Sequence, residues 1–410
     1  MIKKIPAAKI ILGMYIHDLN CSWMAHPFLT NQFEIKSAET IQKILDAGIK
    51  EVYIDTERGR DIPMQRTVSK ALPEKNFDVE QPIAPSAPVE PQQAASPIIM
   101  VPKPDLANEV RRAKKLHTDA SKIMSGMMQD IRLGKQIEVE QCDPVVESIL
   151  DSIFRLPSAL LPLAQVKTRD EYTFQHSVSV AALSVAFGRT LDLPRETIKE
   201  LAMGGLLHDV GKAQIPTAIL NKPGKLTDAE FLIMKRHATL SAELLRDTKG
   251  VSEIAFLAAS QHHERYDGSG YPHGLKGEEI SLYGQMMCIV DVYDAITSLR
   301  IYHKGMPPTE ALRKMFEWSK THFNPRLVQA FIKGIGIYPA GSLVRLESGL
   351  MGIVREVVPT KLLQPVVNIF YHADKLCYLP PKTVDLSSAK DKIVAHESFE
   401  KWGIDQAVWL

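Results

Sequence analysis

The sequence of 410 residues has few cysteines and no Cys-x-x-Cys pair. The four cysteines, Cys21, Cys142, Cys288 and Cys377, are scattered along the chain. Small secreted domains that depend on disulfides carry much denser cysteine patterns, so this sequence argues against a disulfide framework. We expect four reduced thiols with structural roles, as in a cytoplasmic protein.

The sequence also lacks a surplus of one charge and a long apolar run. Its formal net charge is +1, with 24% charged and 45% hydrophobic residues, which is typical of a globular protein. We therefore expect no polymeric nucleic acid as partner, and any anionic ligand must be met by a local group of side chains. The apolar stretch from Ile10 to Ile16 is too short and too interrupted to span a membrane, and no small-residue cleavage site follows it. We expect no membrane insertion.

Prolines are concentrated between Leu72 and Pro104, at positions 73, 82, 85, 88, 91, 97, 102 and 104. Because this composition cannot bury a core and stays extended, residues 71–105 are predicted to be a linker. Residues 1–70 before it are predicted to form a small α/β domain. The expected elements are strands Lys9–Tyr15 and Lys50–Ile54 and a helix, Ser37–Ala47, whose Ile41, Ile44 and Leu45 share one face.

The rest of the sequence predicts a helical domain followed by a strand-rich extension. Apolar spacing predicts helices Leu106–Leu133 and Val145–Leu156, which we assign to connecting helices in residues 106–160. Nearly all of Phe174 to Ile335 has helical spacing broken by Gly and Pro turns, so residues 161–335 are predicted to be an all-α bundle. Residues 336–410 are predicted to be a small β-rich extension. Its expected elements are strands Leu343–Leu346, Met351–Val358 and Pro365–Tyr371 and a closing helix near Glu397–Trp402. The fold class is thus multidomain.

Histidines in the helical region stand next to acids, first at the pair His208 and Asp209. Imidazole and carboxylate ligands together suit transition-metal ions, whereas Ca²⁺ and Mg²⁺ prefer oxygen ligands alone. Adjacent residues on one helix lie about 100° apart, so both side chains could face a shared ion, and Asp209 could bridge two ions. Lys212 follows one turn after His208, close enough to direct its charge at a phosphate or a leaving oxygen.

The most specific segment runs from His262-His263-Glu264 to Asp267-Gly-Ser-Gly-Tyr271-Pro272. A purely structural interpretation is a helix end and a turn, which the glycines and the proline supply. That interpretation leaves the paired histidines and the aspartate unexplained. Tyr271 and the glycine turn are candidates to line a ligand pocket, with partner contact as their alternative role.

Further acids and bases follow in the sequence. Asp291 and Asp294 are three residues apart and share a helical face, and Arg300, His303 and Lys304 come after them. His176 and His237 also lie in segments whose apolar spacing predicts helices. Each of these two is a weak signal by itself, because a single helical histidine is more often structural, and gains weight only from the other ligands.

The order of these residues resembles the HD-GYP subset of the HD phosphohydrolase superfamily over residues 170–335. The Gly-Tyr-Pro extension in register with His-His-Glu and the late Asp makes this resemblance specific. The matching positions are His176, His208-Asp209 with Lys212, His237, His262-His263-Glu264, Asp267 to Pro272, and Asp291. The segments Gly13-Met14-Tyr15, Ser22-Trp23, His26-Pro27-Phe28 and Val52 to Thr56 are similar to the small uncharacterised domain often found N-terminal to such modules.

The resemblance implies a bacterial phosphodiesterase that hydrolyses the second messenger cyclic di-GMP at a centre of two or three divalent ions, usually iron or manganese. The implied metal ligands are His176, His208, Asp209, His237, His262, His263 and Asp291, with Asp209 bridging. Members with a third ion carry Glu four residues before the first His. Here Tyr172 stands at that position, with Glu171 beside it, so two ions are favoured.

The expected catalytic residues are Asp209 and Lys212. The expected substrate-binding residues are Lys212, Tyr271, Asp294, Arg300, His303 and Lys304. His303 stands where many relatives carry a basic residue near the phosphates, so Lys304 or Arg300 would do more of that work. Two ions sharing a water would activate it and open the ring to linear pGpG, whereas a second cut to GMP needs the product to rebind.

Several alternatives stay open. A receptor would bind cyclic di-GMP or a partner protein without cleavage, although the intact ligand set argues against it. Another cyclic dinucleotide or a nucleotide monophosphate could be the substrate, because metals recognise phosphate and not base. A polar core without metal would be costly, since it buries many imidazoles and acids. The N-terminal domain could sense a signal or mediate dimerisation, with signalling proteins as partners, and the Leu106–Leu133 helix could pair with a copy of itself or be buried in its own chain.

Overall fold

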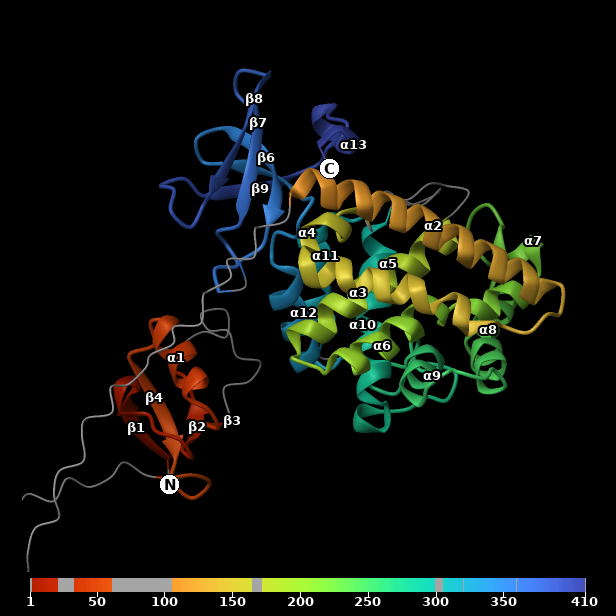
Figure 1. Ribbon diagram of the computed structural model, residues 1–410, viewed down its shortest axis with the longest axis horizontal. Coiled ribbons are helices and arrows are strands. Elements are labelled where there is room, and N and C mark those ends of the chain that lie inside the picture. Colours follow the sequence, from red (N-terminus) through yellow and green to blue (C-terminus); the bar gives the residue numbers. More distant parts are fainter. Residues whose placement is uncertain are drawn as a thin grey trace, which may run out of the picture.

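The computed structural model describes residues 2–20, 33–60, 105–163, 172–298, 305–319, 321–358 and 360–409. Figure 1 shows a small α/β module, a helical bundle and a C-terminal sheet. Nearly all of the predicted linker lies outside the described residues, as do Cys21, Ser22-Trp23, His26-Pro27-Phe28, Glu171, Arg300, His303 and Lys304. The side chain of Tyr172 is not described either.

The N-terminal module is an antiparallel sheet with strand order β1-β4-β2-β3 and one helix. Its elements are β1 (Ile2–Pro6), β2 (Tyr15–Asp18), β3 (Phe33–Glu34), α1 (Ala38–Asp46) and β4 (Glu51–Asp55). The helix and the second predicted strand are confirmed. The predicted strand Lys9–Tyr15 is wrong, because Gly13 has a positive φ of 85° and turns the chain between β1 and β2. Ile44 is buried as predicted, whereas Leu45 is exposed.

The helical bundle has one continuous apolar core. Its helices are α2 (Leu106–Arg132), α3 (Asp143–Arg155), α4 (Pro157–Leu160), α5 (Tyr172–Thr190), α6 (Arg195–Leu207), α7 (Thr217–Leu220), α8 (Asp228–Arg246), α9 (Glu253–Ser260), α10 (Leu282–Thr297), α11 (Pro308–Trp318) and α12 (Pro325–Ile335). On α2, Ala113, Ala120 and Met124 belong to the same core. The apolar face of α2 is therefore buried within its own chain, which is the second of the two alternatives for this helix.

The C-terminal region is a five-stranded antiparallel sheet with strand order β8-β7-β6-β5-β9. Its strands are β5 (Leu343–Leu346), β6 (Leu350–Glu356), β7 (Val366–His372), β8 (Cys377–Asp385) and β9 (Ile393–Glu397), and α13 (Gln406–Trp409) follows. The three predicted strands are confirmed, and β8 and β9 are additional. The predicted helix start at Glu397 is wrong, because Glu397 pairs with Leu343 of β5. Only a short 3₁₀ turn, Glu400–Trp402, and then α13 are helical.

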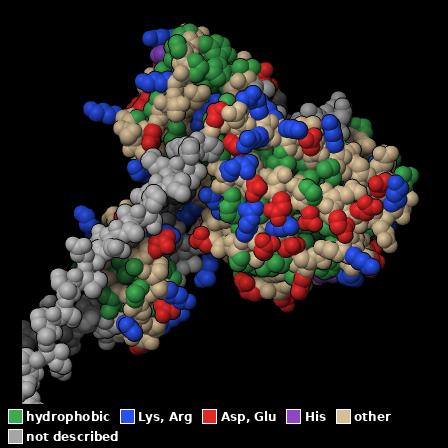
Figure 2. Space-filling view, viewed as in Figure 1, with side chains coloured by type: hydrophobic (Ala, Val, Ile, Leu, Met, Phe, Trp, Pro, Cys, Tyr) green, Lys and Arg blue, Asp and Glu red, His purple; other side chains and the backbone are tan. Residues whose placement is uncertain are grey.

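The surface of the bundle carries both signs of charge. On the face in Figure 2, acidic side chains lie between basic ones over the helical region. Within the described residues, no helix has both the length and the apolar character needed to cross a membrane.

Candidate metal centre

The seven predicted metal ligands converge inside the bundle, although they come from separate elements. His176 lies on α5, His237 on α8 and Asp291 on α10; His208 caps the end of α6 with Asp209 after it, and His262 and His263 follow α9. Their donor atoms form three overlapping groups in which all donors lie within 4.8 Å of one another. These groups are His237, His262 and His263; His176, His208 and Asp291; and His208, Asp209 and His262.

The backbone at His208 and Asp209 is not the continuous helix that the spacing argument assumed. Helix α6 ends at Leu207, Asp209 has φ −102° and ψ 8°, and a 3₁₀ turn follows at Val210–Gln214. This turn packs closely on α8, because a Cβ on Gly211 would lie only 2.2 Å from the carbonyl oxygen of His237. The glycine thus allows Asp209 to approach the histidine of the neighbouring helix.

Asp209 lies between two sets of imidazoles. Its Oδ2 is 3.3 Å from Nε2 of His208 and 3.7 Å from Nε2 of His176. Its Oδ1 is 3.3 Å from Nε2 of His237 and 4.0 Å from Nε2 of His262. A carboxylate whose two oxygens face different imidazole sets has the arrangement of a ligand that bridges two ions.

Asp291 and His263 complete the two sets. Asp291 Oδ1 is 3.0 Å from Nε2 of His176, and its Oδ2 is 3.8 Å from Nδ1 of His263. His263 Nε2 lies 3.0 Å from Nε2 of His237. Two imidazole nitrogens at this distance face a common point, which suits a shared cation.

Three of the histidines are oriented by backbone carbonyls. In each case Nδ1 lies at hydrogen-bond distance from the carbonyl oxygen three residues earlier, at the end of a helix or within it. The pairs are His208 with Gly205 at 2.7 Å, His237 with Met234 at 2.7 Å and His262 with Ala259 at 2.5 Å. With the proton on Nδ1, each Nε2 lone pair is directed into the cluster, which is the tautomer a metal requires.

Asp294 orients a fourth histidine. Its Oδ2 is 2.6 Å from Nδ1 of His176, and its side chain is buried. Asp294 was predicted among the substrate-binding residues, which stays a prediction; its contact with His176 is an interaction that the sequence analysis did not foresee. The reason is that the two helices α5 and α10 pack side by side, which residue spacing on α10 alone does not show.

The pKa shifts of His262, His263 and Asp209 suit metal binding. Burial lowers the pKa of His262 well below its usual range, and it lowers the pKa of His263 to about 3. Burial opposes ionisation of Asp209, but Lys212 and His208 outweigh it and hold the pKa of this carboxyl well below its usual range. Neutral imidazoles and ionised carboxylates are the forms that bind metals.

The fit to metal ions follows from the buried donors. His208 Nε2 and Asp209 Oδ1 are buried and have no hydrogen-bond partner within the part of the chain that the structure describes. Unsatisfied buried polar atoms are expensive, and a mixed imidazole and carboxylate set suits transition-metal ions. The residues of the cluster therefore fit the metal ions that the sequence implies.

Lys212 lies at the edge of the cluster, where its ammonium donates to Asp209 Oδ2. Its side chain remains partly exposed. The ammonium is therefore the ion-pair partner of the central carboxylate.

The loop that carries Tyr271 is anchored by Glu264, a role that the sequence analysis missed. Glu264 is buried and accepts the backbone N–H groups of His273 at 2.7 Å and Leu275 at 3.0 Å. Gly270 permits the tight path of the loop, because a Cβ there would lie 2.3 Å from the backbone nitrogen of Arg265. The loop thereby places the Tyr271 ring 4.6 Å from the His263 ring.

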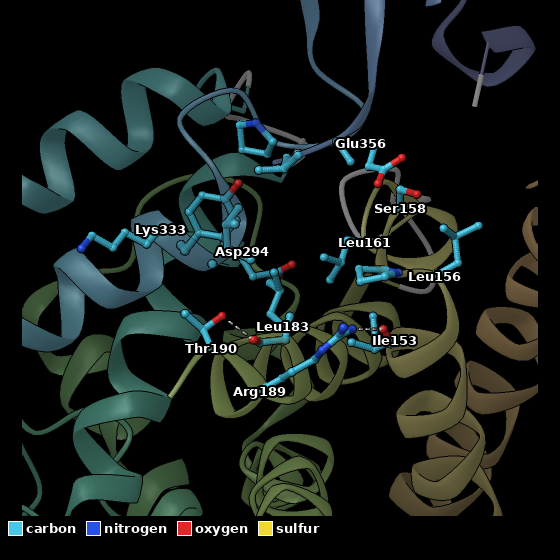
Figure 3. A pocket seen from close by; sticks show the side chains of 18 of the residues that line it. Ile153, Leu156, Ser158, Leu161, Leu183, Arg189, Thr190, Asp294, Lys333 and Glu356 are labelled. Atoms are coloured by element: carbon cyan, nitrogen blue, oxygen red, sulfur yellow. Dashed lines mark hydrogen bonds between the residues drawn. The ribbon is translucent and has the colours of Figure 1, made fainter. Parts of the chain in front are cut away.

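A cavity of about 540 Å³ lies between the bundle and the C-terminal sheet. Figure 3 shows it lined by Leu183 and Arg189 of α5, Asp294 of α10, Lys333 of α12 and Glu356 of β6. None of the seven predicted metal ligands lines it. The cavity shares Asp294 with the cluster, but it holds no comparable set of metal donors.

Two family models match the chain. A domain of unknown function (DUF3391) matches residues 2–142, and an HD domain matches residues 161–327. The chain is 42% identical to a cyclic di-GMP phosphodiesterase of Pseudomonas aeruginosa, over 98% of this chain and 94% of that protein. This similarity includes all three regions of the fold.

Other relatives match a smaller part. A cyclic di-GMP phosphodiesterase of Thermotoga maritima is 37% identical over 45% of this chain and 50% of its own length. A 3'3'-cGAMP-specific phosphodiesterase of Vibrio cholerae is 41% identical over 38% of this chain and 36% of its own. Among solved structures, an HDGYP protein of Bdellovibrio bacteriovorus aligns over 81% of this chain and 98% of its own, with 15% identity and a TM-score of 0.46.

Proposed function

The chain belongs to the HD-GYP family of HD-domain phosphodiesterases, and from this premise we propose that it hydrolyses cyclic di-GMP to linear pGpG with two divalent ions. The relative that matches over nearly the whole chain carries the name of this activity. The observation that supports the proposal most directly is the position of Asp209, whose two oxygens face two different sets of imidazoles.

We assign two ion positions to the cluster. The first takes Nε2 of His176 and His208, Asp209 Oδ2 and Asp291 Oδ1. The second takes His237, His262, His263 and Asp209 Oδ1. Iron or manganese is the proposed metal, because imidazole-rich sets with carboxylates suit such ions.

Divalent ions bound to these residues supply a water of lowered pKa and polarise the phosphodiester. The chain's own residues fix the geometry of this chemistry. Asp209 holds the two positions together, while Asp294 and the three backbone carbonyls keep the imidazoles oriented. Fixed donors of this kind require no reorganisation when charge develops during the reaction.

Lys212 supplies a positive charge at the edge of the reacting groups. In the reaction it would turn from Asp209 Oδ2 toward an oxygen of the phosphodiester and stabilise the charge that grows there. We expect Lys212→Ala to lower kcat more than it raises KM, because this interaction strengthens in the transition state.

The test is anaerobic turnover of cyclic di-GMP by protein purified with its native metal, with product chromatography and metal counting. His208→Ala and Asp209→Ala are expected to abolish conversion to pGpG, with a loss on the order of 10³-fold or more. Asp247 is an exposed aspartate at the C-terminal end of α8 and offers a control of the same charge. Asp247→Ala is expected to retain the wild-type rate.

Three outcomes are informative. About two ions per chain with pGpG as end product supports the proposal as stated. Metal-loaded protein that binds cyclic di-GMP without cleaving it would replace the enzyme with a receptor. Conversion that continues to GMP would keep the activity and correct the end product.

A further inference from the structure

Lys235 lies between two aromatic rings at the edge of the candidate metal centre. It stands on α8, two residues before His237, and its Nζ is 5.0 Å from the ring centroid of Phe231 and 5.0 Å from that of Tyr271. The Tyr271 ring lies 4.6 Å from the His263 ring, tilted by 35°. These side chains form a continuous row from the surface of α8 to the cluster.

Among the described residues, the contacts recorded for the ammonium of Lys235 are these two aromatic rings. No carboxylate pairs with it in the parts of the chain that the structure describes, whereas Lys212 binds Asp209 and Lys222 binds Glu230. Contact with aromatic faces holds an ammonium in place without a negative partner. Lys235 therefore keeps N–H donors for an acceptor that comes from outside the chain.

The outer end of the row is an exposed aromatic ring. Phe231 is 47% exposed, and it lies one helical turn before Lys235, so both share a face of α8. An exposed ring beside a reaction site can stack on a nucleobase, and such stacking tolerates any base. The aromatic faces thus provide affinity for any base, whereas the ammonium of Lys235 and the hydroxyl of Tyr271 are the polar groups of the row that can tell bases apart, and the ammonium is the one that only donates.

We propose that Lys235, held between Phe231 and Tyr271, selects guanine as the base beside the phosphodiester that is cut. Guanine presents two acceptors, O6 and N7, on one edge, to which a lysine donates, whereas adenine presents N7 next to an amino group. The inference rests on the proposed function and adds the base preference that the metal ligands cannot supply.

The alternative role for Lys235 is a phosphate contact. A lysine that binds phosphate as a point charge would favour guanine and adenine nucleotides equally. The ratio between guanine and adenine substrates therefore separates the two roles, and absolute rates do not.

The experiment compares kcat/KM for cyclic di-GMP and cyclic di-AMP in the wild type, Lys235→Gln, Lys235→Arg and Arg236→Gln. The last variant removes a charge from the exposed neighbouring residue and is the matched control. We expect Lys235→Gln to lower the preference for cyclic di-GMP by about tenfold or more, Lys235→Arg to restore most of it, and Arg236→Gln to keep it.

A binding measurement accompanies the rates. Equilibrium dialysis measures the affinity of the same proteins for pGpG and pApA. We expect Lys235→Gln to lose the preference for pGpG in this binding measurement as well. Hydrolysis of bis(p-nitrophenyl) phosphate, which has no base, is expected to stay within about twofold of the wild type, which also checks that the variant is folded and metal-loaded.

An equal loss of kcat/KM for both dinucleotides in Lys235→Gln would overturn the inference. A loss of bis(p-nitrophenyl) phosphate hydrolysis in this variant would overturn it as well. A wild type that cleaves neither dinucleotide would contradict the proposed function, and the dialysis ratio would then decide the base preference separately.

Discussion

The metal cluster and the cavity beneath the C-terminal sheet meet at Asp294 but differ in chemistry. In the cluster, the buried metal-binding atoms His208 Nε2 and Asp209 Oδ1 have no hydrogen-bond partner among the described residues. In the cavity, Arg189 donates to the carbonyl oxygen of Ile153 and Thr190 to that of Ala186. The cavity wall also holds a buried polar atom without such a partner, the Tyr293 hydroxyl oxygen, but only the cluster brings several metal-binding atoms within reach of one another. The candidate metal centre is thus distinguished by grouped imidazole and carboxylate atoms, and not by the volume of a cavity.

Of the predictions that follow from this comparison, the largest effect is expected at Asp294, the residue common to the cluster and the cavity. Asp294→Ala removes the acceptor from Nδ1 of His176, so we expect metal affinity to fall by about 10- to 100-fold, with activity restored at high metal concentration. Asp294→Asn keeps an acceptor and is expected to lose less. Competition with a chelator measures the affinity. Unchanged metal affinity with a raised KM would instead support substrate binding by Asp294.

The next effect concerns the loop in front of the cluster. Glu264→Gln replaces one acceptor oxygen by an amino group that faces a backbone N–H, of His273 or of Leu275. We expect kcat/KM to fall by about tenfold because Tyr271 loses its fixed position. Glu278→Gln is the control, since Glu278 is exposed and accepts only the Tyr266 hydroxyl nearby. Equal effects of both variants would show that loop anchoring is not what matters.

The cavity is expected to affect stability and not turnover. Leu183 is buried and lines the cavity, so Leu183→Ala should lower the free energy of unfolding by about 2–5 kcal/mol. Activity per folded molecule should stay within about twofold, because Leu183 lines the cavity and is not one of the metal-binding residues of the cluster. Denaturant titration and turnover at matched folded concentration measure both. A large loss of turnover would make the cavity part of the site.

The smallest effect is at the surface of α8. A hydrogen bond from Lys222 lowers the pKa of Glu230 to about 2. Because this is below the ordinary value of 4.5, the pair stabilises the folded protein above pH 4.5, and the stabilisation is lost as pH falls toward 2. Glu230→Gln is expected to lower Tm by roughly 1–3 °C at pH 7 and by less in acid. Lys222→Gln should match it, and the double variant should add little; turnover should not change.

Much of the fold could be predicted from spacing. The helix Leu106–Arg132 and the strand Leu343–Leu346 follow from local sequence patterns, because the helix buries its apolar face and the strand is a short, largely apolar run in which Leu343, Val344 and Leu346 are all buried. The prediction of a strand at Lys9–Tyr15 was wrong because a short apolar run can also surround a turn. The prediction that a helix begins at Glu397 was wrong because Glu397 pairs with Leu343 in the sheet. This contact joins residues far apart in sequence, so local spacing does not show it.

The candidate site was likewise predictable from the sequence only in part. The sequence by itself determined which side chains are available as metal ligands, namely the histidines and aspartates that converge in the bundle, because residue identity and order are properties of the chain. Only the tertiary structure decided that Asp294 supports His176, that Glu264 anchors the loop and that Lys235 lies between two rings. His176 and Asp294 are separated by 118 residues, and their contact exists because α5 and α10 pack together. Orientation within a site depends on such packing, which no local pattern encodes.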